Sequence, residues 1–178
     1  MPETVRKVMM GATGPLLVHK AYVELFKVLQ DNVDRKHWAP VTLTGVPGIG
    51  KSLFAIYLVW RLIRESRTSN KEVHIAYRKH TSQHCWMAII HGGRVIDCAN
   101  FPQNEFGWND SHPFYTTVPS TAIWTIFDSE TPPDLPQLGT VLLVTSPQVH
   151  LWKEWEKQNV QTSITLCMPE WTDAEMDQ

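Results

Sequence analysis

The chain has 178 residues, of which 43% are hydrophobic and 19% charged, and its formal net charge is −2. A chain of this length buries one core comfortably, so we expect a single domain over residues 1–178. The longest apolar run, residues 53–60, is far shorter than the roughly 20 residues that cross a bilayer, which excludes a membrane-spanning helix. Thirteen of the sixteen Lys and Arg residues lie in residues 1–80, but such asymmetry usually marks a solvated surface and predicts no nucleic-acid partner.

Residues 1–38 are expected to lead into the domain through one amphipathic helix. Apolar residues recur at helical spacing within the segment 21–36: Tyr22, Leu25, Phe26 and Leu29. The segment 39–45 then predicts a short buried strand that ends at Gly45. Residues 51–64 are good helix formers and apolar almost all round, so they predict a helix that is covered on more than one side.

Strand patterns dominate the rest of the chain. Residues 73–78 predict one strand, and residues 86–99 predict a hairpin that turns at Gly92 and Gly93. Apolar runs predict three more strands, over residues 121–130, 140–148 and 163–171, with a short helix over residues 149–158. Strands and helices that alternate in this way predict an α/β fold in which helices cover both faces of a sheet.

The octet GVPGIGKS at residues 45–52 matches the pattern G-x-x-x-x-G-K-[ST] in full. Glycines let backbone N–H groups converge on phosphate oxygens, and the N-terminus of the following helix adds a favourable dipole. Lys51 would place a compact positive charge against the β- and γ-phosphates, and Ser52 would offer its hydroxyl to Mg²⁺. The predicted nucleotide loop comprises Gly45, Val46, Pro47, Gly48, Ile49, Gly50, Lys51, Ser52 and Leu53. The alternative is a strand-to-helix turn whose lysine points to solvent, but such a turn would not need all of these residue types together.

A phosphate loop also requires an acidic residue at the tip of a buried strand, where it orients the water shell of the metal. Asp128 in AIWTIFD meets this requirement, and the alternative is an acid that merely begins a loop. Many ATPases carry a glutamate directly after that aspartate, but this chain has Ser129 there and Glu130 one residue further on. Since residues two apart on a strand share a side, Glu130 is the candidate to polarise the attacking water.

A polar group at the end of the neighbouring strand would sense the γ-phosphate through that water. Thr145 and Ser146 in LLVTSPQ suit this role, and capping of a helix after Pro147 is the alternative. The expected cofactors are ATP and Mg²⁺, with Ser52 and Asp128 as the candidate metal residues. The candidate catalytic residues are Lys51, Asp128, Glu130, Thr145 and Ser146.

Five segments resemble, in this order, the NTPase domain of Crinkler effectors and of the related retrotransposon hot spot proteins: LLVHKAYVELF, VTLTGVPGIGKSLFAIYLVWRLI, TIFDSETPP, TVLLVTSPQVHLWKEWEK and TLCMPEWTDAEM. The most specific parts are TGVPGIGKS and the pair TSPQ and MPEW. The resemblance implies an ATPase of the AAA-like or STAND-like branch of P-loop proteins, with an extra strand between the P-loop strand and the metal-binding strand. The expected fold is thus an α/β P-loop NTPase three-layer sandwich, with a mainly parallel central sheet and a β-hairpin insertion near residues 73–99.

By this resemblance, residues 39–178 form the nucleotide-binding core, Asp128 is the metal residue, and Thr145 or Ser146 is the sensor. The family usually continues past MPEW into a lid, so we expect a core without a lid, for which a second copy in a homo-oligomer would supply a positive charge. The family also implies a secreted effector that acts in the nucleus of a host cell. A nucleic-acid partner is implied by the family alone.

The sequence therefore predicts an ATP-binding domain that hydrolyses the γ-phosphate of ATP with Mg²⁺. The alternative is a nucleotide-binding switch or interaction module with little or no turnover, since Ser129 occupies the usual position of the base. A kinase is a weaker alternative, because no acceptor site is recognisable. ATP is favoured over GTP because the chain has no N-K-x-D motif for guanine.

Overall fold

The computed structural model describes residues 18–34, 40–79, 84–102, 122–128, 139–146 and 163–172. These residues form a mixed α/β structure with a seven-stranded sheet in the order β4-β3-β2-β5-β6-β1-β7. The strands are β1 (Val41–Thr44), β2 (Glu72–Lys79), β3 (His84–His91), β4 (Arg94–Pro102), β5 (Ile123–Asp128), β6 (Thr140–Val144) and β7 (Ile164–Cys167). The described helices are α2 (Lys20–Asp34) and α3 (Lys51–Ser69).

The five strands β2, β5, β6, β1 and β7 are parallel to one another, which confirms a mainly parallel sheet. Strand β6 lies between β1 and β5, as the family resemblance implied. The carboxyl ends of parallel strands meet at one edge of a sheet, where ligands of α/β proteins usually bind. The segments that follow β1, β5 and β6 therefore start from the same edge.

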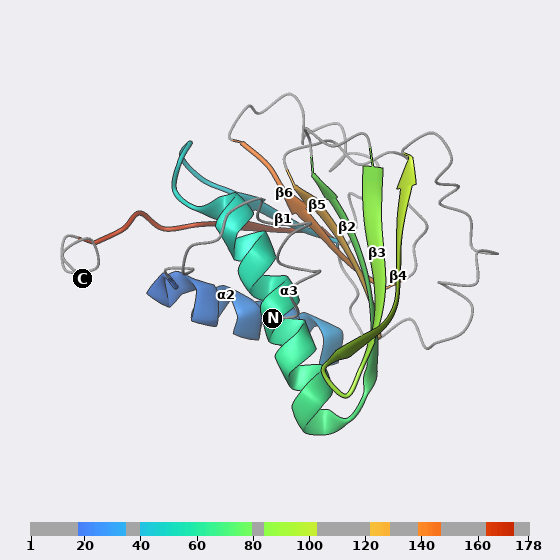
Figure 1. Ribbon diagram of the computed structural model, residues 1–178. Helices are drawn as coiled ribbons and strands as arrows, with labels where there is room; N and C mark the ends of the chain where they lie inside the picture. The colour runs from blue at the N-terminus through green and yellow to red at the C-terminus, as the bar shows by residue number, and fades with distance from the viewer. Residues whose placement is uncertain are drawn as a thin grey trace.

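The predicted hairpin, formed by β3 and β4, lies at the end of the strand order opposite to β7. Strand β2 pairs with β3 in the antiparallel sense, and β3 pairs in turn with β4, which is the outermost strand on that side (Figure 1). The chain turns at Gly92 and Gly93, which have φ values of 56° and 75°. These positive angles at both central residues are those of the tight turn expected from the glycine pair.

Helix α3 packs against one face of the sheet and also against α2, which confirms that it is covered on more than one side (Figure 1). On one side, Phe54 and Tyr57 contact the ring of Tyr22 from α2. The apolar residues of α3 join a core with alternate sheet residues that include Ile75, Ile126 and Leu142. The helix is longer than the predicted 51–64: it continues through polar residues and ends before Asn70, whose left-handed conformation (φ 52°) closes its C-terminus.

Residues on the second face of the sheet are buried as well, among them Phe127 and Leu143. The helix predicted over residues 149–158 lies outside the described residues, so the described part of the sandwich is the layer of α2 and α3 and the sheet itself. Within the described ranges, neither helix is long and apolar enough to cross a membrane.

Candidate nucleotide-binding site

The predicted nucleotide loop connects β1 to α3 at the carboxyl edge of the parallel strands. Its glycines adopt conformations that other residues rarely take, with φ values of 147° at Gly45, 79° at Gly48 and 103° at Gly50. Gly50 is the N-cap of α3 and offers no side chain to the helix. The first N–H groups of α3, from Lys51 onward, therefore keep the capacity to bind an anion that every uncapped helix N-terminus has. The apolar side chain of Val46, 45% exposed, points away from the core.

The side chain of Lys51 folds back over the loop. Its ammonium Nζ donates hydrogen bonds to Gly45 O at 2.7 Å and to Val46 O at 2.8 Å. The residue is only 8% exposed, and this burial lowers the pKa of the ammonium below that of free lysine, although electrostatic interactions with Cys167 and Asp128 act in the opposite direction. Lys51 thus lies inside the loop and does not point to solvent.

The Ser52 hydroxyl and the Asp128 carboxylate meet across the edge of the sheet. Ser52 Oγ donates to Asp128 Oδ1 at 2.8 Å, which joins the first turn of α3 to the last residue of β5. Asp128 is 2% exposed, and its second oxygen, Oδ2, accepts a hydrogen bond from the Tyr77 hydroxyl at 3.1 Å. Burial raises the pKa of Tyr77, and the adjacent Asp128 charge and hydrogen bond raise it further, so the phenol remains a donor.

This pair of oxygen atoms fits Mg²⁺. The ion prefers oxygen ligands at about 2.0–2.1 Å in an octahedron, so two neighbouring ligands lie about 2.9 Å apart. Ser52 Oγ and Asp128 Oδ1 are separated by 2.8 Å. No group of three or more His, Cys, Asp or Glu side chains among the described residues could hold a metal ion. A site with one hydroxyl and one carboxylate suits a cation that takes its remaining ligands from phosphate and water.

The candidate sensor residues follow β6. Thr145 is buried, its N–H donates to Leu43 O of β1 at 3.0 Å, and its hydroxyl is 3.3 Å from Ser146 O. Both residues therefore lie at the edge of the sheet between β1 and β5, and their role as sensors stays a prediction. The alternative, capping of a helix after Pro147, involves residues outside the described part of the chain. Ser129 and Glu130 lie outside it as well.

Sequence reasoning missed three aromatic residues at this site: Tyr77, Tyr22 and Trp171. Tyr77 contacts Asp128 as described above, whereas the hydroxyl of Tyr22 and the indole N–H of Trp171 bind carbonyls of the loop. A signal existed for Tyr77, because strand alternation places it on the same face as Ile75 and strand β2 runs beside β5. Nothing local to Tyr22 or Trp171 indicated the contact with the loop.

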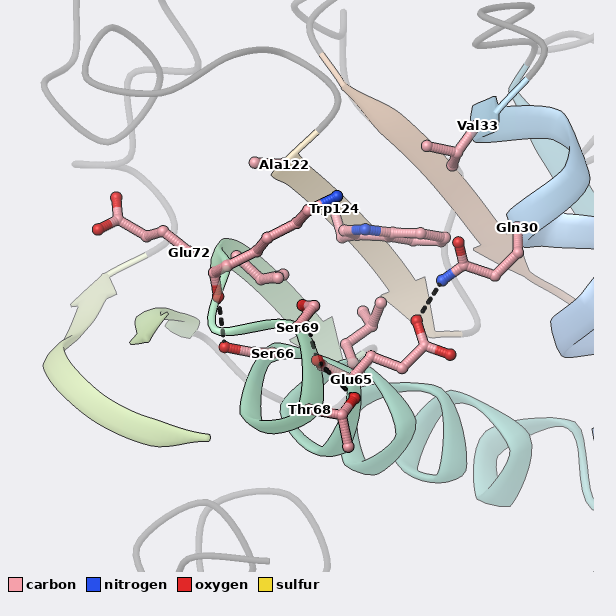
Figure 2. A pocket seen from close by; sticks show the side chains of 12 residues that line it. Gln30, Val33, Glu65, Ser66, Thr68, Ser69, Glu72, Ala122 and Trp124 are labelled. Carbon is pink, nitrogen blue, oxygen red and sulfur yellow. Dashed lines mark hydrogen bonds between the residues drawn. The ribbon is translucent and has the colours of Figure 1, made fainter. Parts of the chain in front are cut away.

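A separate cavity of about 590 Å³ lies at the opposite end of α3 (Figure 2). Its walls come from the last turns of α2 and α3 and from the first residues of β2 and β5, with Trp124 beside Gln30 and Glu65. Its polar groups bind one another: Gln30 Nε2 donates to Glu65 Oε2 at 2.8 Å, and Ser66 Oγ donates to Lys71 O at 2.6 Å. The cavity is therefore distinct from the loop site, and the hydrogen bonds of Glu65 and Ser66 that line it stabilise the C-terminal end of α3.

Comparison with known proteins gives two similar sequences. Crinkler effector proteins 15 and 16 of Phytophthora infestans are each 29% identical to this chain over 140 residues. The aligned region is 75% of this chain but only 19% of each relative, so the chain spans about a fifth of their length. No family model matches the chain, and no solved structure matches it significantly. The similarity agrees with the Crinkler resemblance found in the sequence motifs, and the names of the relatives state no nucleotide chemistry.

Proposed function

We propose that this chain is a P-loop NTPase domain that binds ATP with Mg²⁺ and hydrolyses its γ-phosphate. One observation carries the proposal: the Ser52 hydroxyl lies 2.8 Å from the Asp128 carboxylate, beside a loop that matches the phosphate-binding pattern in full. The two residues are 76 positions apart in the chain. A strand-to-helix turn without a ligand would not need a hydroxyl after its lysine and a buried acid opposite that hydroxyl.

The residues of the loop would bind the triphosphate through backbone amides and one ammonium group. The N–H groups of Gly50, Lys51 and Ser52 would donate to phosphate oxygens, and Lys51 Nζ would leave Gly45 O and Val46 O for the same ligand. The ammonium would exchange two neutral acceptors for negatively charged phosphate oxygens, so the attraction between opposite charges favours the bound state. Ser52 and Asp128 would hold Mg²⁺, which neutralises phosphate charge when bound.

Hydrolysis would need a water molecule in line with the γ-phosphate. Thr145 and Ser146, which follow β6, would contact that water, and Glu130 is the carboxylate proposed to polarise it. A nucleotide-binding switch with little turnover is the second candidate, because Ser129 directly follows Asp128 and offers no carboxylate. In either case a cation from a second copy of the chain would complete the charge around the phosphates.

The similarity to two proteins named effectors supports a wider proposal about where this domain acts. We place it in a secreted effector that acts in the nucleus of a host cell, as the family resemblance implies. Nucleic acid is then a partner proposed on the family alone, and the described residues have no feature that selects it.

Titration calorimetry with ATP and GTP in the presence of Mg²⁺ tests binding, and a phosphate-release assay tests turnover. Lys51→Ala should weaken ATP binding about 10- to 100-fold, because one charged hydrogen bond contributes about 1.5–3 kcal/mol. Lys71→Ala, which changes an exposed lysine just beyond the other end of α3, is the matched control and should bind as the wild type does. Glu130→Gln should retain binding and lose phosphate release.

Three results would separate the candidates. Binding with release supports the ATPase, and tight binding without release even at high protein concentration supports the switch. A wild-type protein that binds neither nucleotide at millimolar concentration would contradict both proposals.

A further inference from the structure

Two aromatic side chains from distant parts of the sequence hold the outer side of the nucleotide loop. The Tyr22 hydroxyl of α2 donates to Gly50 O at 2.8 Å, and the Trp171 indole Nε1 donates to Ile49 O at 3.1 Å. Trp171 follows β7 in the segment MPEW and is 122 positions from its partner. The two acceptors are consecutive carbonyls, immediately before the lysine of the loop.

These hydrogen bonds fix the direction of the amides that would face phosphate. In a trans peptide the C=O of one residue and the N–H of the next point in opposite directions, and the described part of the chain has no cis peptide bond. A donor that holds Ile49 O therefore also orients the N–H of Gly50. In the same way, Gly50 O accepts from the Tyr22 hydroxyl and, at 2.9 Å, from the Phe54 N–H of α3, and these two donors together orient the N–H of Lys51.

The two donors are themselves fixed by their surroundings. Tyr22 is fully buried, and its ring centroid is 5.5 Å from those of Phe54 and Tyr57. Burial raises the pKa of the Tyr22 hydroxyl to about 12, so it remains a donor at neutral pH. The ring of His19 connects the two donors, since its centroid lies 4.3 Å from that of Trp171 in an edge-on contact and 5.8 Å from that of Tyr22 in a stacked one.

We propose that Tyr22 and Trp171 are positioning residues for phosphate binding: they act from the outer side of the loop to aim the N–H groups of Gly50 and Lys51 at the ligand. The inference rests on the proposed function and extends it. It also gives a role to residues in two of the segments that carry the family resemblance, LLVHKAYVELF and MPEW.

Two conservative substitutions test the inference. Tyr22→Phe and Trp171→Phe each remove one donor and keep an aromatic ring, and calorimetry with Mg²⁺-pyrophosphate and Mg²⁺-ATP then measures the affinity. Each should weaken both ligands by the same factor, about fivefold to tenfold, which is the usual effect of one hydrogen bond. Tyr57→Phe is the control for the loss of a buried hydroxyl, because its Oη accepts from Arg61 and does not touch the loop. Trp60→Phe is the control for the indole.

A second measurement separates positioning from loss of stability. The chain has nine glycines, so ¹⁵N-glycine labelling gives few NMR signals. Pyrophosphate should shift the Gly50 amide signal in the wild type and shift it much less in Trp171→Phe at saturating ligand, because Trp171 holds the carbonyl of the same peptide unit. A ¹⁵N-lysine sample should show the same difference for the Lys51 amide in Tyr22→Phe. The signals of Gly92 and Gly93, in the distant hairpin, should be the same in all proteins.

The outcomes distinguish this inference from the function on which it rests. Variants that bind within twofold of the wild type and show its full amide shift, at Gly50 for Trp171→Phe and at Lys51 for Tyr22→Phe, overturn the positioning role and leave the phosphate loop intact. An equal loss of affinity in both control variants overturns it too, since the effect would then follow from aromatic packing in general. If the wild type binds neither pyrophosphate nor ATP, the proposed function fails and the inference fails with it.

Discussion

Gly50 is the position of the loop at which a side chain should do most damage. Its φ of 103° is one that residues with a Cβ rarely adopt, and a Cβ added there would lie 2.5 Å from the Tyr22 hydroxyl oxygen. Tyr22 cannot turn away cheaply, because it is fully buried against Phe54 and Tyr57. Gly50→Ala therefore combines backbone strain with overlap. Gly48→Ala is the matched control, since Gly48 has φ 79° and no atom within 4 Å of the added Cβ.

The two contributions can be estimated separately. A residue other than glycine in a left-handed conformation costs about 1–2 kcal/mol, which is the expected loss of unfolding free energy in Gly48→Ala. Overlap in a packed region adds about 1–3 kcal/mol, so Gly50→Ala should lose about 2–5 kcal/mol. In a Tyr22→Phe background the nearest ring atom would be Cζ at 3.6 Å, an ordinary contact. The effect of Gly50→Ala should then fall to that of Gly48→Ala.

Urea unfolding of the single and double variants measures these free energies, and the coupling between positions 22 and 50 follows from the double-mutant cycle. Additive losses would refute the argument, because they would mean that the tyrosine oxygen does not restrict residue 50. So would a Gly50→Ala variant no less stable than Gly48→Ala.

Three further changes test the chemistry of the site. Tyr77→Phe removes the hydrogen bond to Asp128 Oδ2, so half-maximal ATP binding should need about tenfold more Mg²⁺ in calorimetric titrations, and an unchanged requirement would contradict the contact. Ser52→Ala should also raise the Mg²⁺ requirement. It should leave the affinity for metal-free pyrophosphate within about twofold of the wild type, which is less than the loss of one hydrogen bond to the ligand would cause. Because burial lowers the pKa of Lys51 from 10.5, its ammonium loses its proton at a lower pH than free lysine does. The ATP affinity of the wild type should therefore decrease as pH rises toward 10.5. The ATP affinity of Lys51→Arg should stay nearly constant over the same range, because a guanidinium keeps its charge. A wild-type affinity that does not change with pH would argue against the role of the ammonium.

The elements of the fold were predictable where the sequence shows local periodicity. Short apolar runs with turn residues around them predicted the buried strands, and the glycine pair predicted the hairpin. The end of α3 was not predictable in this way, because its last turn is polar and the stop depends on the left-handed Asn70. Sheet order depends on pairing between distant segments, so the placement of β6 between β1 and β5 came from the family resemblance and not from strand patterns.

The site residues that were predictable are likewise those that belong to a local sequence pattern. The loop motif predicted Lys51 and Ser52, and a strand tip with an acid predicted Asp128, since each is a local pattern with a chemical reason. The supports of the loop were missed because their partners are backbone carbonyls, which any residue type can supply. Tyr22 is 28 positions and Trp171 is 122 positions from the carbonyl that each one binds. No spacing rule connects such pairs before the fold is known.

The contacts of Lys51 explain how the loop keeps its shape before a ligand arrives. Its ammonium binds Gly45 O and Val46 O from inside, while Tyr22 and Trp171 hold Gly50 O and Ile49 O from outside. If phosphate binds as proposed, the ammonium would exchange two neutral acceptors for charged ones, and the carbonyl of the exposed Val46 would turn to water. Only the inner hydrogen bonds need to change, so the amides of the loop should already point toward the ligand, and little ordering of the backbone should oppose binding.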